Sequence, residues 1–427
     1  MNYPLRLELE THNVQRLAFS ETTFLRDGVL ALNRAELLAL LQSSPLIADV
    51  EIALAHPGDD VRLIHLLDAI EPRCKLEGRA RIFPGLLGDP NSAGEGKTRR
   101  LAGMAILTAA QYPVPVGGLL QTREAIVDMS GPAAPYSIFS TTANLVLTFH
   151  STPDSSNADF DNAIRLASLR LAEFLTQQVE NHSPHNIETF ELTPTAPDLP
   201  RIVYLYQAQA QGTFSDTYLY GTPIHNLVPT LLHPNETMDG AIVSGNYVYA
   251  CFKNPTYLHL NNPVIRELYS EHGKTLNFAG IVFYRGHNYT DAEKKRAANY
   301  AAKLARFLDA DGVILTGEGG GNSAIDMMLA LKECERLGIK TTVITYELGG
   351  PEGKDFPLVD NEPEANAIIS TGSCDKTIQL PAIGQVVGGT TYLDTAQPAT
   401  EPREIMLDKI YCSTNQLGAG YLMTQAY

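Results

Sequence analysis

Residues 312–347 read GVILTGEGGGNSAIDMMLALKECERLGIKTTVITYE, and this stretch decides the predicted fold. Each end of the stretch is an apolar run as long as a typical strand. Between the two runs, apolar side chains recur with the spacing of a helix that ends at Gly338. Residues 276–284, LNFAGIVFY, predict a preceding strand, and residues 292–310 predict a helix that ends before Asp311-Gly312. This alternation of strands and helices predicts a parallel, doubly wound α/β sheet.

Weaker patterns lie on both sides of this stretch. Residues 365–372 and 377–381 predict one more strand and an edge strand. Residues 201–209, RIVYLYQAQ, predict a buried strand, and residues 158–180 predict a helix with one apolar face. The segment 181–200 holds four Pro and predicts a connecting segment.

The beginning of the chain predicts a β-rich region. Four short segments alternate or run apolar at strand length: LRLELE (5–10), GVLALN (28–33), ADVEIALA (48–55) and DVRLIHL (60–66). Asn33 is a suitable cap for a short helix, and Glu36 three residues later resembles a capping box. We therefore predict an α/β chain (α+β overall) with three regions: β-rich 1–150, α/β 151–274, and doubly wound 275–427.

Composition excludes several classes of protein. The 427 residues carry a net charge of −16, and the largest basic groups are residues 97–100 and 294–296. A nucleic-acid or anionic-membrane partner needs a basic face, so neither is expected. No apolar run approaches the roughly 18 residues of a membrane span, and the N-terminus lacks the apolar core of a signal peptide. Five Cys without paired spacing predict a reduced, cytoplasmic protein.

The glycine-rich loop at residues 317–322 is the first candidate site. It follows a predicted strand and opens a helix, where Asn322 is a possible N-cap and Asp326 lies one turn on. Glu318 and Gly319 lie within this loop, and a helix N-terminus there can hold a carboxylate or phosphate. The spacing is not GxGxxG, so dinucleotide binding is rejected. The alternative is a tight turn without a ligand.

A second group of candidates lies in residues 236–264, ETMDGAIVSGNYVYACFKNPTYLHLNNPV. His259, Asn261 and Asn262 fall in a predicted Pro-bounded loop, where polar side chains often bind ligands. His259 is a candidate base. A weak metal hypothesis combines His233 with His259, Asp239 or Glu318, and Cys251 is either a redox or metal thiol or a buried apolar side chain.

Segments along nearly the whole chain resemble one protein family. They include IEPRCKLEG (70–78), VDMSGP (127–132), MDGAIVSGN (238–246), KNPTY (253–257) and DGVILTGEGGGN (311–322). Together they are similar to the proprotein subunit of component B of glycine, sarcosine and betaine reductases. In that family an Asn-Cys bond cleaves itself and the Cys becomes a pyruvoyl group.

At the matching pair this chain has Asn246-Tyr247. Self-cleavage needs a β-hydroxyl or β-thiol that can attack the preceding carbonyl, and the Tyr oxygen lies across a phenyl ring. We therefore expect an intact chain without pyruvoyl, and no cofactor is predicted, although a metal is possible. The turn of Gly245, Asn246 and Tyr247 can still line a pocket, with the Tyr247 phenol as donor or general acid, or Tyr247 only fills space.

The resemblance implies a hetero-oligomer. Family members work with a second subunit that carries selenocysteine or Cys, so a selenoprotein-B-like partner and a small nitrogen-containing substrate are expected. Two other functions remain open: a lyase or hydrolase that uses His259 and Glu318 with or without a metal, and a catalytically silent scaffold.

Overall fold

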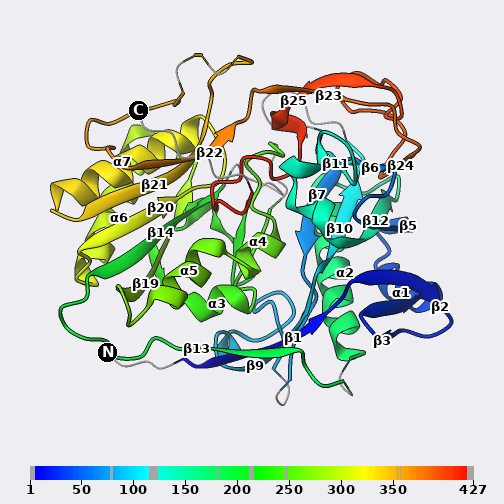
Figure 1. Ribbon diagram of the computed structural model, residues 1–427, viewed down its shortest axis with the longest axis horizontal. Coiled ribbons are helices and arrows are strands. Elements are labelled where there is room, and N and C mark those ends of the chain that lie inside the picture. The colour runs from blue at the N-terminus through cyan, green and yellow to red at the C-terminus, as the bar shows by residue number, and fades with distance from the viewer. Residues whose placement is uncertain are drawn as a thin grey trace.

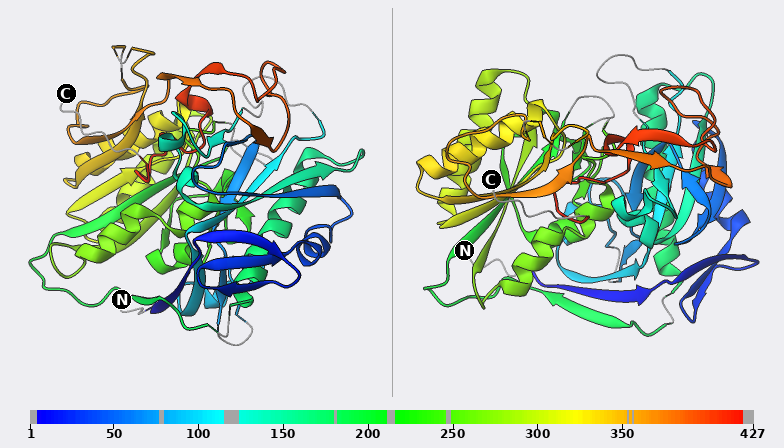
Figure 2. Two further views of the ribbon diagram at one scale, coloured as in Figure 1. Left: turned by 45° about the vertical axis from the view of Figure 1, so that its right-hand side comes forward. Right: turned by 45° about the horizontal axis from the view of Figure 1, so that its top comes forward.

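A computed structural model describes residues 5–76, 80–114, 124–179, 182–210, 216–245, 249–352, 354–355 and 357–420. A six-stranded sheet with its helices occupies one side of the molecule, and several smaller sheets from the N-terminal third occupy the other (Figures 1 and 2). The prediction of a mixed α/β chain with a β-rich beginning is confirmed.

The large sheet has the strand order β17-β19-β14-β20-β21-β22. Its strands are β14 (Arg201–Gln209), β17 (Thr230–Leu232), β19 (Asn277–Gly286), β20 (Gly312–Thr316), β21 (Lys340–Glu347) and β22 (Ile368–Ser373). The strands from β19 to β22 run parallel, and the short edge strand β17 is antiparallel to β19. The narrower prediction of a doubly wound parallel sheet beginning near residue 275 is not confirmed, because β14 lies inside this sheet and β17 runs the other way.

Alternating side chains of β14 point into two different apolar clusters. Tyr204 and Tyr206 pack with residues of α4 (Thr256–Leu260) and α5 (Pro263–Glu271). Val203 and Leu205 pack with α6 (Asp291–Phe307) and α7 (Asn322–Arg336) on the opposite face. The sheet is therefore buried on both faces, which explains the nearly continuous apolar run RIVYLY.

The N-terminal third forms two four-stranded sheets and a small three-stranded one. The first has the order β13 (Asn186–Phe190), β1 (Leu7–Asn13), β9 (Gly96–Ala102), β8 (Arg73–Lys75); the second has β5 (Ile47–Ala55), β12 (Ala143–Ser151), β10 (Met104–Ala110), β7 (Leu66–Ile70). The third joins β2 (Arg16–Ser20), β4 (Val29–Asn33) and β3 (Phe24–Arg26). Helices α1 (Arg34–Leu41) and α2 (Asn157–Gln177) share one apolar core with these sheets.

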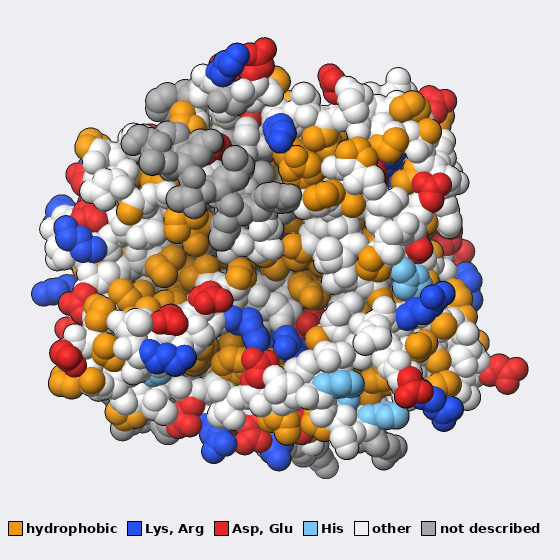
Figure 3. Space-filling model, viewed as in Figure 1, with side chains coloured by type: hydrophobic (Ala, Val, Ile, Leu, Met, Phe, Trp, Pro, Cys, Tyr) orange, Lys and Arg blue, Asp and Glu red, His pale blue; other side chains and the backbone are white. Residues whose placement is uncertain are grey.

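Several small elements complete the chain. They are α3 (Pro234–Met238), β15 (Tyr218–Leu219), β16 (Thr222–Pro223), β18 (Ile242–Val243), β6 (Val61–Leu63), β11 (Val127–Asp128), β24 (Gln385–Val387), β23 (Thr377–Leu380) and β25 (Arg403–Met406). No helix within the described ranges is both long and apolar enough to cross a membrane. On the face shown in Figure 3, acidic and basic side chains are interspersed rather than gathered into a basic surface.

Three local predictions need correction. The predicted connecting segment 181–200 contains β13, which pairs with β1. The predicted edge strand at 377–381 is β23, which pairs with β25 in a separate sheet. Asn33 caps α1 as predicted, but Glu36 accepts a hydrogen bond from the Thr23 hydroxyl, and that hydroxyl oxygen accepts the Asn33 N–H. The division of the chain into three regions stays a prediction.

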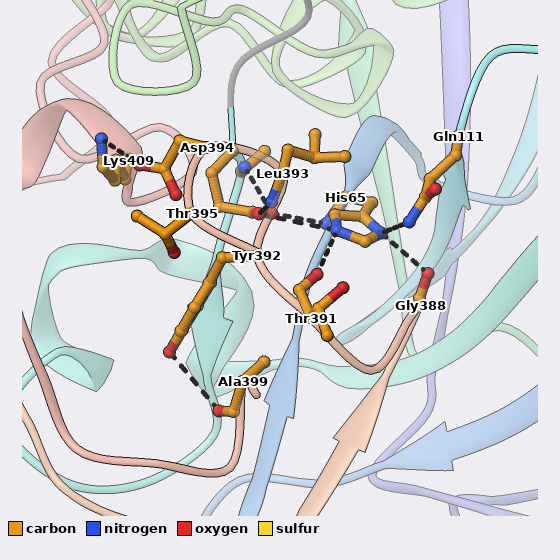
Figure 4. A network of polar contacts seen from close by, with 12 residues as sticks. His65, Gln111, Gly388, Thr391, Tyr392, Leu393, Asp394, Thr395, Ala399 and Lys409 are labelled. Carbon is orange, nitrogen blue, oxygen red and sulfur yellow. Dashed lines mark hydrogen bonds and ion pairs between the residues drawn. The ribbon is translucent and has the colours of Figure 1, made fainter. Parts of the chain in front are cut away.

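The C-terminal segment returns to the N-terminal third. Strand β24 pairs in parallel with β6, so Gln385 lies opposite Val61. Beside it, the ring nitrogens of buried His65 lie 3.1 Å from the Gly388 carbonyl oxygen and 3.0 Å from the Thr391 carbonyl oxygen (Figure 4). Burial opposes protonation of His65, but the hydrogen bond and charge of Glu124, together with the two carbonyl acceptors, raise its pKa.

Candidate functional site

The first feature of the site is the buried amine of Lys253. Gly245 is the last described residue before the Asn246-Tyr247 pair, and its carbonyl oxygen accepts a hydrogen bond from Lys253 Nζ. A Cβ at position 245 would clash with the carbonyl oxygen of Asp216, so only Gly fits. Residues 246–248 lie outside the described ranges, so the roles predicted for Asn246 and Tyr247 stay predictions.

Two buried carboxyl groups, Asp68 and Glu318, lie near the Lys253 amine. Burial raises the pKa of both carboxyls, and the charge of Lys253 opposes that rise. Burial lowers the pKa of Lys253, and the charges of Asp68 and Glu318 oppose the fall. Each group is therefore shifted towards its neutral form by a surrounding of low polarity.

Hydrogen bonds fix Glu318 where the chain leaves β20. Its carboxylate accepts the N–H of Gln209 at 3.1 Å, the N–H of Asn254 at 3.0 Å and the hydroxyl of Thr217 at 3.1 Å. Asp68 accepts both the N–H and the hydroxyl of Thr256, at 2.9 and 2.6 Å. Asp68 thus comes from strand β7, and Glu318 comes from the loop that follows β20.

His259 belongs to this group, although not to a loop as predicted. It lies in helix α4 and is fully buried, with Nδ1 2.5 Å from the hydroxyl of Tyr206. Burial, assisted by the charge of Lys253, lowers the pKa of His259 to about 3. The neutral imidazole accepts a hydrogen bond from the phenol, which keeps its proton because burial raises the pKa of Tyr206 well above 10.

Asn262 connects the same strands to helix α5. Its side-chain oxygen caps α5 through the N–H groups of Val264 and Ile265. Its side-chain nitrogen donates to the hydroxyl of Tyr204 at 3.2 Å, and that hydroxyl shares a hydrogen bond with Thr316 at 2.6 Å. The role of Asn262 in this structure is therefore to position α5 against β14 and β20.

Asn261 lies in a different network. Its side-chain oxygen accepts hydrogen bonds from Arg73 at 2.7 Å and Arg100 at 3.1 Å. Arg73 also donates to Glu71 and to the Met238 carbonyl oxygen. The neighbouring residues Asn261 and Asn262 are thus not held together at one site.

The glycine-rich loop brings its predicted residues to the end of β20. Gly319 has φ +87°, and a Cβ there would clash with the side chain of Gln209. The N-cap of α7 is Gly321, not Asn322, whose side chain donates to the Asn288 carbonyl oxygen at 2.9 Å. Asp326 accepts the N–H of Asn288 at 2.9 Å and pairs with Lys294 at 3.0 Å.

The three weak metal candidates are separated. His233 caps α3, while Asp239 pairs with Lys75 and accepts hydrogen bonds from Thr98 at 2.6 Å and from the Gly94 N–H at 2.7 Å. Cys251 lies in an apolar cluster with Cys374 and Tyr346. Over the described part of the chain, no three His, Cys, Asp or Glu side chains are grouped so that they could hold a metal ion.

Sequence reasoning missed Lys253 and Asp68. Lys253 was inside the quoted motif KNPTY, and Asp68 is a lone carboxyl in the apolar run LIHLLDAI at 63–70. A charged residue inside a buried strand was the available signal. Together the residues form a buried amine, two carboxyls and a neutral imidazole beside the Gly245 carbonyl, an arrangement suited to proton transfer or to attack by an amine.

Comparisons with known proteins point to one family. The model of the family described as glycine/sarcosine/betaine reductase component B subunits matches residues 5–424. The chain is 35% identical over 438 residues to the glycine reductase complex component B subunits alpha and beta of Acetoanaerobium sticklandii, covering 99% of this chain and 100% of that one. It is 36% identical to the sarcosine reductase complex component B subunit alpha of Peptoclostridium acidaminophilum, covering 92% and 91%. No solved structure matches.

Proposed function

The chain belongs to the family of glycine/sarcosine/betaine reductase component B subunits, and we propose that it is an unprocessed, substrate-binding subunit of a heteromeric reductase-like enzyme. Its substrate would be a small nitrogen-containing metabolite, and a partner subunit would supply the reacting thiol or selenol. The names of the relatives, which are components of reductase complexes, support the hetero-oligomer.

One observation carries the proposal. Lys253 bonds to the Gly245 carbonyl oxygen, two residues before residue 247 of the family-like segment, and its charge acts on the buried Asp68, Glu318 and His259. Buried ionisable side chains lower the stability of the fold, and a functional role explains why a protein keeps them. This group therefore favours a chemical site over a silent scaffold. At residue 247 the Tyr lacks the β-heteroatom that self-cleavage requires, which supports an intact chain without pyruvoyl.

The lyase or hydrolase alternative receives less support. His259 is fully buried with Nδ1 bonded to Tyr206, and the metal candidates His233, Asp239 and Cys251 lie in separate networks. No described residue set favours it over the reductase-like reading.

The proposal is tested by affinity purification of the chain from its native host, followed by denaturing intact mass measurement. We expect one species near the chain mass of 46.5 kDa, together with a second subunit that contains Cys or selenocysteine. Two fragments that sum to 46.5 kDa would overturn the unprocessed state, and a chain that never brings a second subunit would overturn the heteromer.

A Tyr247→Cys variant tests whether only residue 247 blocks cleavage. Its thiol restores the β-nucleophile, so we expect two fragments in the intact mass spectrum. Tyr247→Ala, which has no β-heteroatom, is the matched control and should stay whole. If Tyr247→Cys also stays whole, the surrounding geometry no longer supports the acyl shift.

A further inference from the structure

The start of helix α7 combines several features of a binding site. Gln209 is the last residue of β14, and the glycine-rich loop 317–321 follows the neighbouring parallel strand β20. After β14 the chain continues on the face of the six-stranded sheet against which Ile224 and Met238 pack. After β20 it continues into α7, which packs on the opposite face of this sheet. The carboxyl ends of two adjacent parallel strands whose connections leave on opposite faces form the crevice where open α/β sheets bind ligands.

Helix α7 begins without a side-chain cap. Of the described helices with eight or more residues, α1, α2, α5 and α6 begin with a side chain that accepts a backbone N–H, and α7 does not. Its N-cap is Gly321, and a Cβ at Gly321 would meet no described atom within 4 Å. At the positive end of this 15-residue helix, Gly321 N–H donates to the Tyr346 hydroxyl at 3.1 Å and Ala324 N–H to the Gly321 carbonyl oxygen, which leaves the N–H groups of Asn322 and Ser323 without a partner among the described residues.

The second and independent observation is the side chain of Gln209. It is fully buried, and neither its Oε1 nor its Nε2 has a hydrogen-bond partner in the described part of the chain. It points to the glycine-rich loop, because a Cβ at Gly319 would clash with Gln209 Oε1 and lie 2.9 Å from Ser323 Oγ. A buried amide normally has partners, so this one marks a position where a ligand supplies them.

Charges around the crevice disfavour a dianion. The Glu318 carboxyl is occupied by the N–H groups of Gln209 and Asn254, and Asp326 is paired with Lys294 at 3.0 Å. Glu318 nevertheless brings a buried acidic group close by, which disfavours a dianion such as phosphate. A planar carboxylate has two oxygens, and these match one amide N–H of Gln209 and the backbone N–H groups at the start of α7.

We infer that the crevice between Gln209 and the first turn of α7 binds the carboxylate of a small metabolite. The amide nitrogen of Gln209 and the helix N–H groups donate to it, and Gln209 Oε1 remains available to accept from a donor on the same ligand. The assignment of this ligand as the substrate rests on the proposed function, whereas the binding itself is a property of the isolated chain.

The test is calorimetric titration of the purified full chain with sodium acetate and with inorganic phosphate at constant ionic strength. We expect saturable binding of acetate to the wild type, and at least tenfold weaker binding to Gln209→Met and Gln209→Glu. Gln178→Met, at the C-cap of helix α2, is the matched control and should bind as the wild type does. Absent acetate binding, unchanged binding in both Gln209 variants, or tighter binding of phosphate would each overturn the inference.

A second measurement uses only the wild type, so it does not depend on whether a variant folds. Hydrogen exchange of the wild type, followed by mass spectrometry, should slow in the first turn of α7 when acetate replaces chloride. Protection that arises only elsewhere, or none, would overturn the inference. Acetate binding with no second subunit in the purification would count only against the proposed function, and a stable heteromer without acetate binding only against this site.

Discussion

Two buried histidines show how surroundings decide the charge of one residue type. No carboxylate of the described residues pairs with the His259 ring, and burial together with the charge of Lys253 lowers the pKa of His259 to about 3. Burial also opposes protonation of His65, but the hydrogen bond and charge of Glu124 outweigh it and raise the pKa of His65. A sequence shows neither partner, so neither charge state could be predicted from residue type alone.

His259 should make the protein acid-sensitive. In the unfolded chain its pKa is the ordinary 6.5 and in the folded chain about 3, so a falling pH protonates the unfolded chain first. Above pH 6.5 His259 is neutral in both states. The free energy of unfolding therefore decreases by about 3 kcal/mol between pH 6.5 and pH 4. His259→Gln, which does not titrate, should lose correspondingly less stability in urea unfolding over this window.

The control for that measurement is His150→Gln, because the His150 side chain is half exposed and paired with Glu51 at the surface. This variant should keep the wild-type dependence of the unfolding free energy on pH. An equal pH dependence in His259→Gln and the wild type would show that His259 is not held neutral.

At the scale of elements, long periodic patterns were predictable and short contacts were not. The strand predicted at 201–209 is β14, and the helix predicted at 292–310 is α6 to within three residues. The Asn322 cap was wrong because Gly321, with φ +66°, takes the cap position and leaves the Asn322 side chain to bind Asn288. Similarly, His259 was assigned to a loop because Pro residues flank a helix of only five residues.

The Glu124 charge should favour the charged form of His65, and that form should bind the segment after β24 more tightly. Without the Glu124 charge, burial, two carbonyl contacts and the Gln111 side chain, 3.2 Å from Nδ1, remain to act on His65, so Glu124→Gln should move the pKa of His65 below its wild-type value. In the wild type the stabilisation is complete below pH 6.5 and is lost as the pH rises through the raised pKa. An NMR titration of the ring Cε1–H resonances measures the shift, and limited proteolysis near residues 388–393 measures the looser segment.

An unchanged His65 resonance in Glu124→Gln would contradict this account. Glu51→Gln provides the control, because Glu51 pairs with a histidine at the exposed surface and should leave the His65 titration unaltered.

Across the whole molecule, buried charges connect parts of the chain that are distant in sequence. Arg62 pairs with Asp128 at 2.6 Å and donates to the Tyr392 hydroxyl and the Ala399 carbonyl oxygen, each at 2.8 Å. The sequence indicated a β-rich N-terminal region and a later α/β region, but it contained no signal that residues 381–399 return to Arg62. The same holds for the site, where Asp68 and Glu318 come together only through the tertiary fold.

Arg62→Met should therefore destabilise the protein strongly. It leaves the fully buried Asp128 without its cation, and breaking a buried pair typically costs about 3–5 kcal/mol in the free energy of unfolding. Arg6→Met removes an exposed pair with Glu8 at 2.9 Å and should change stability by less than about 1 kcal/mol. Equal unfolding free energies for the two variants, measured in urea, would show that the Arg62 contacts do not stabilise the fold.

The pairing of β24 with β6 also has a consequence for biosynthesis. The Arg62 and Tyr392 side chains that meet here are 330 residues apart, and the ribosome makes the chain from its N-terminus. While those residues are translated, the free edge of β6 has no native neighbour on that side, and its buried Arg62 lacks most of its acceptors. The N-terminal third therefore reaches its final state only after residues 381–399 have left the exit tunnel, which extends the time for chaperones to act on the nascent chain.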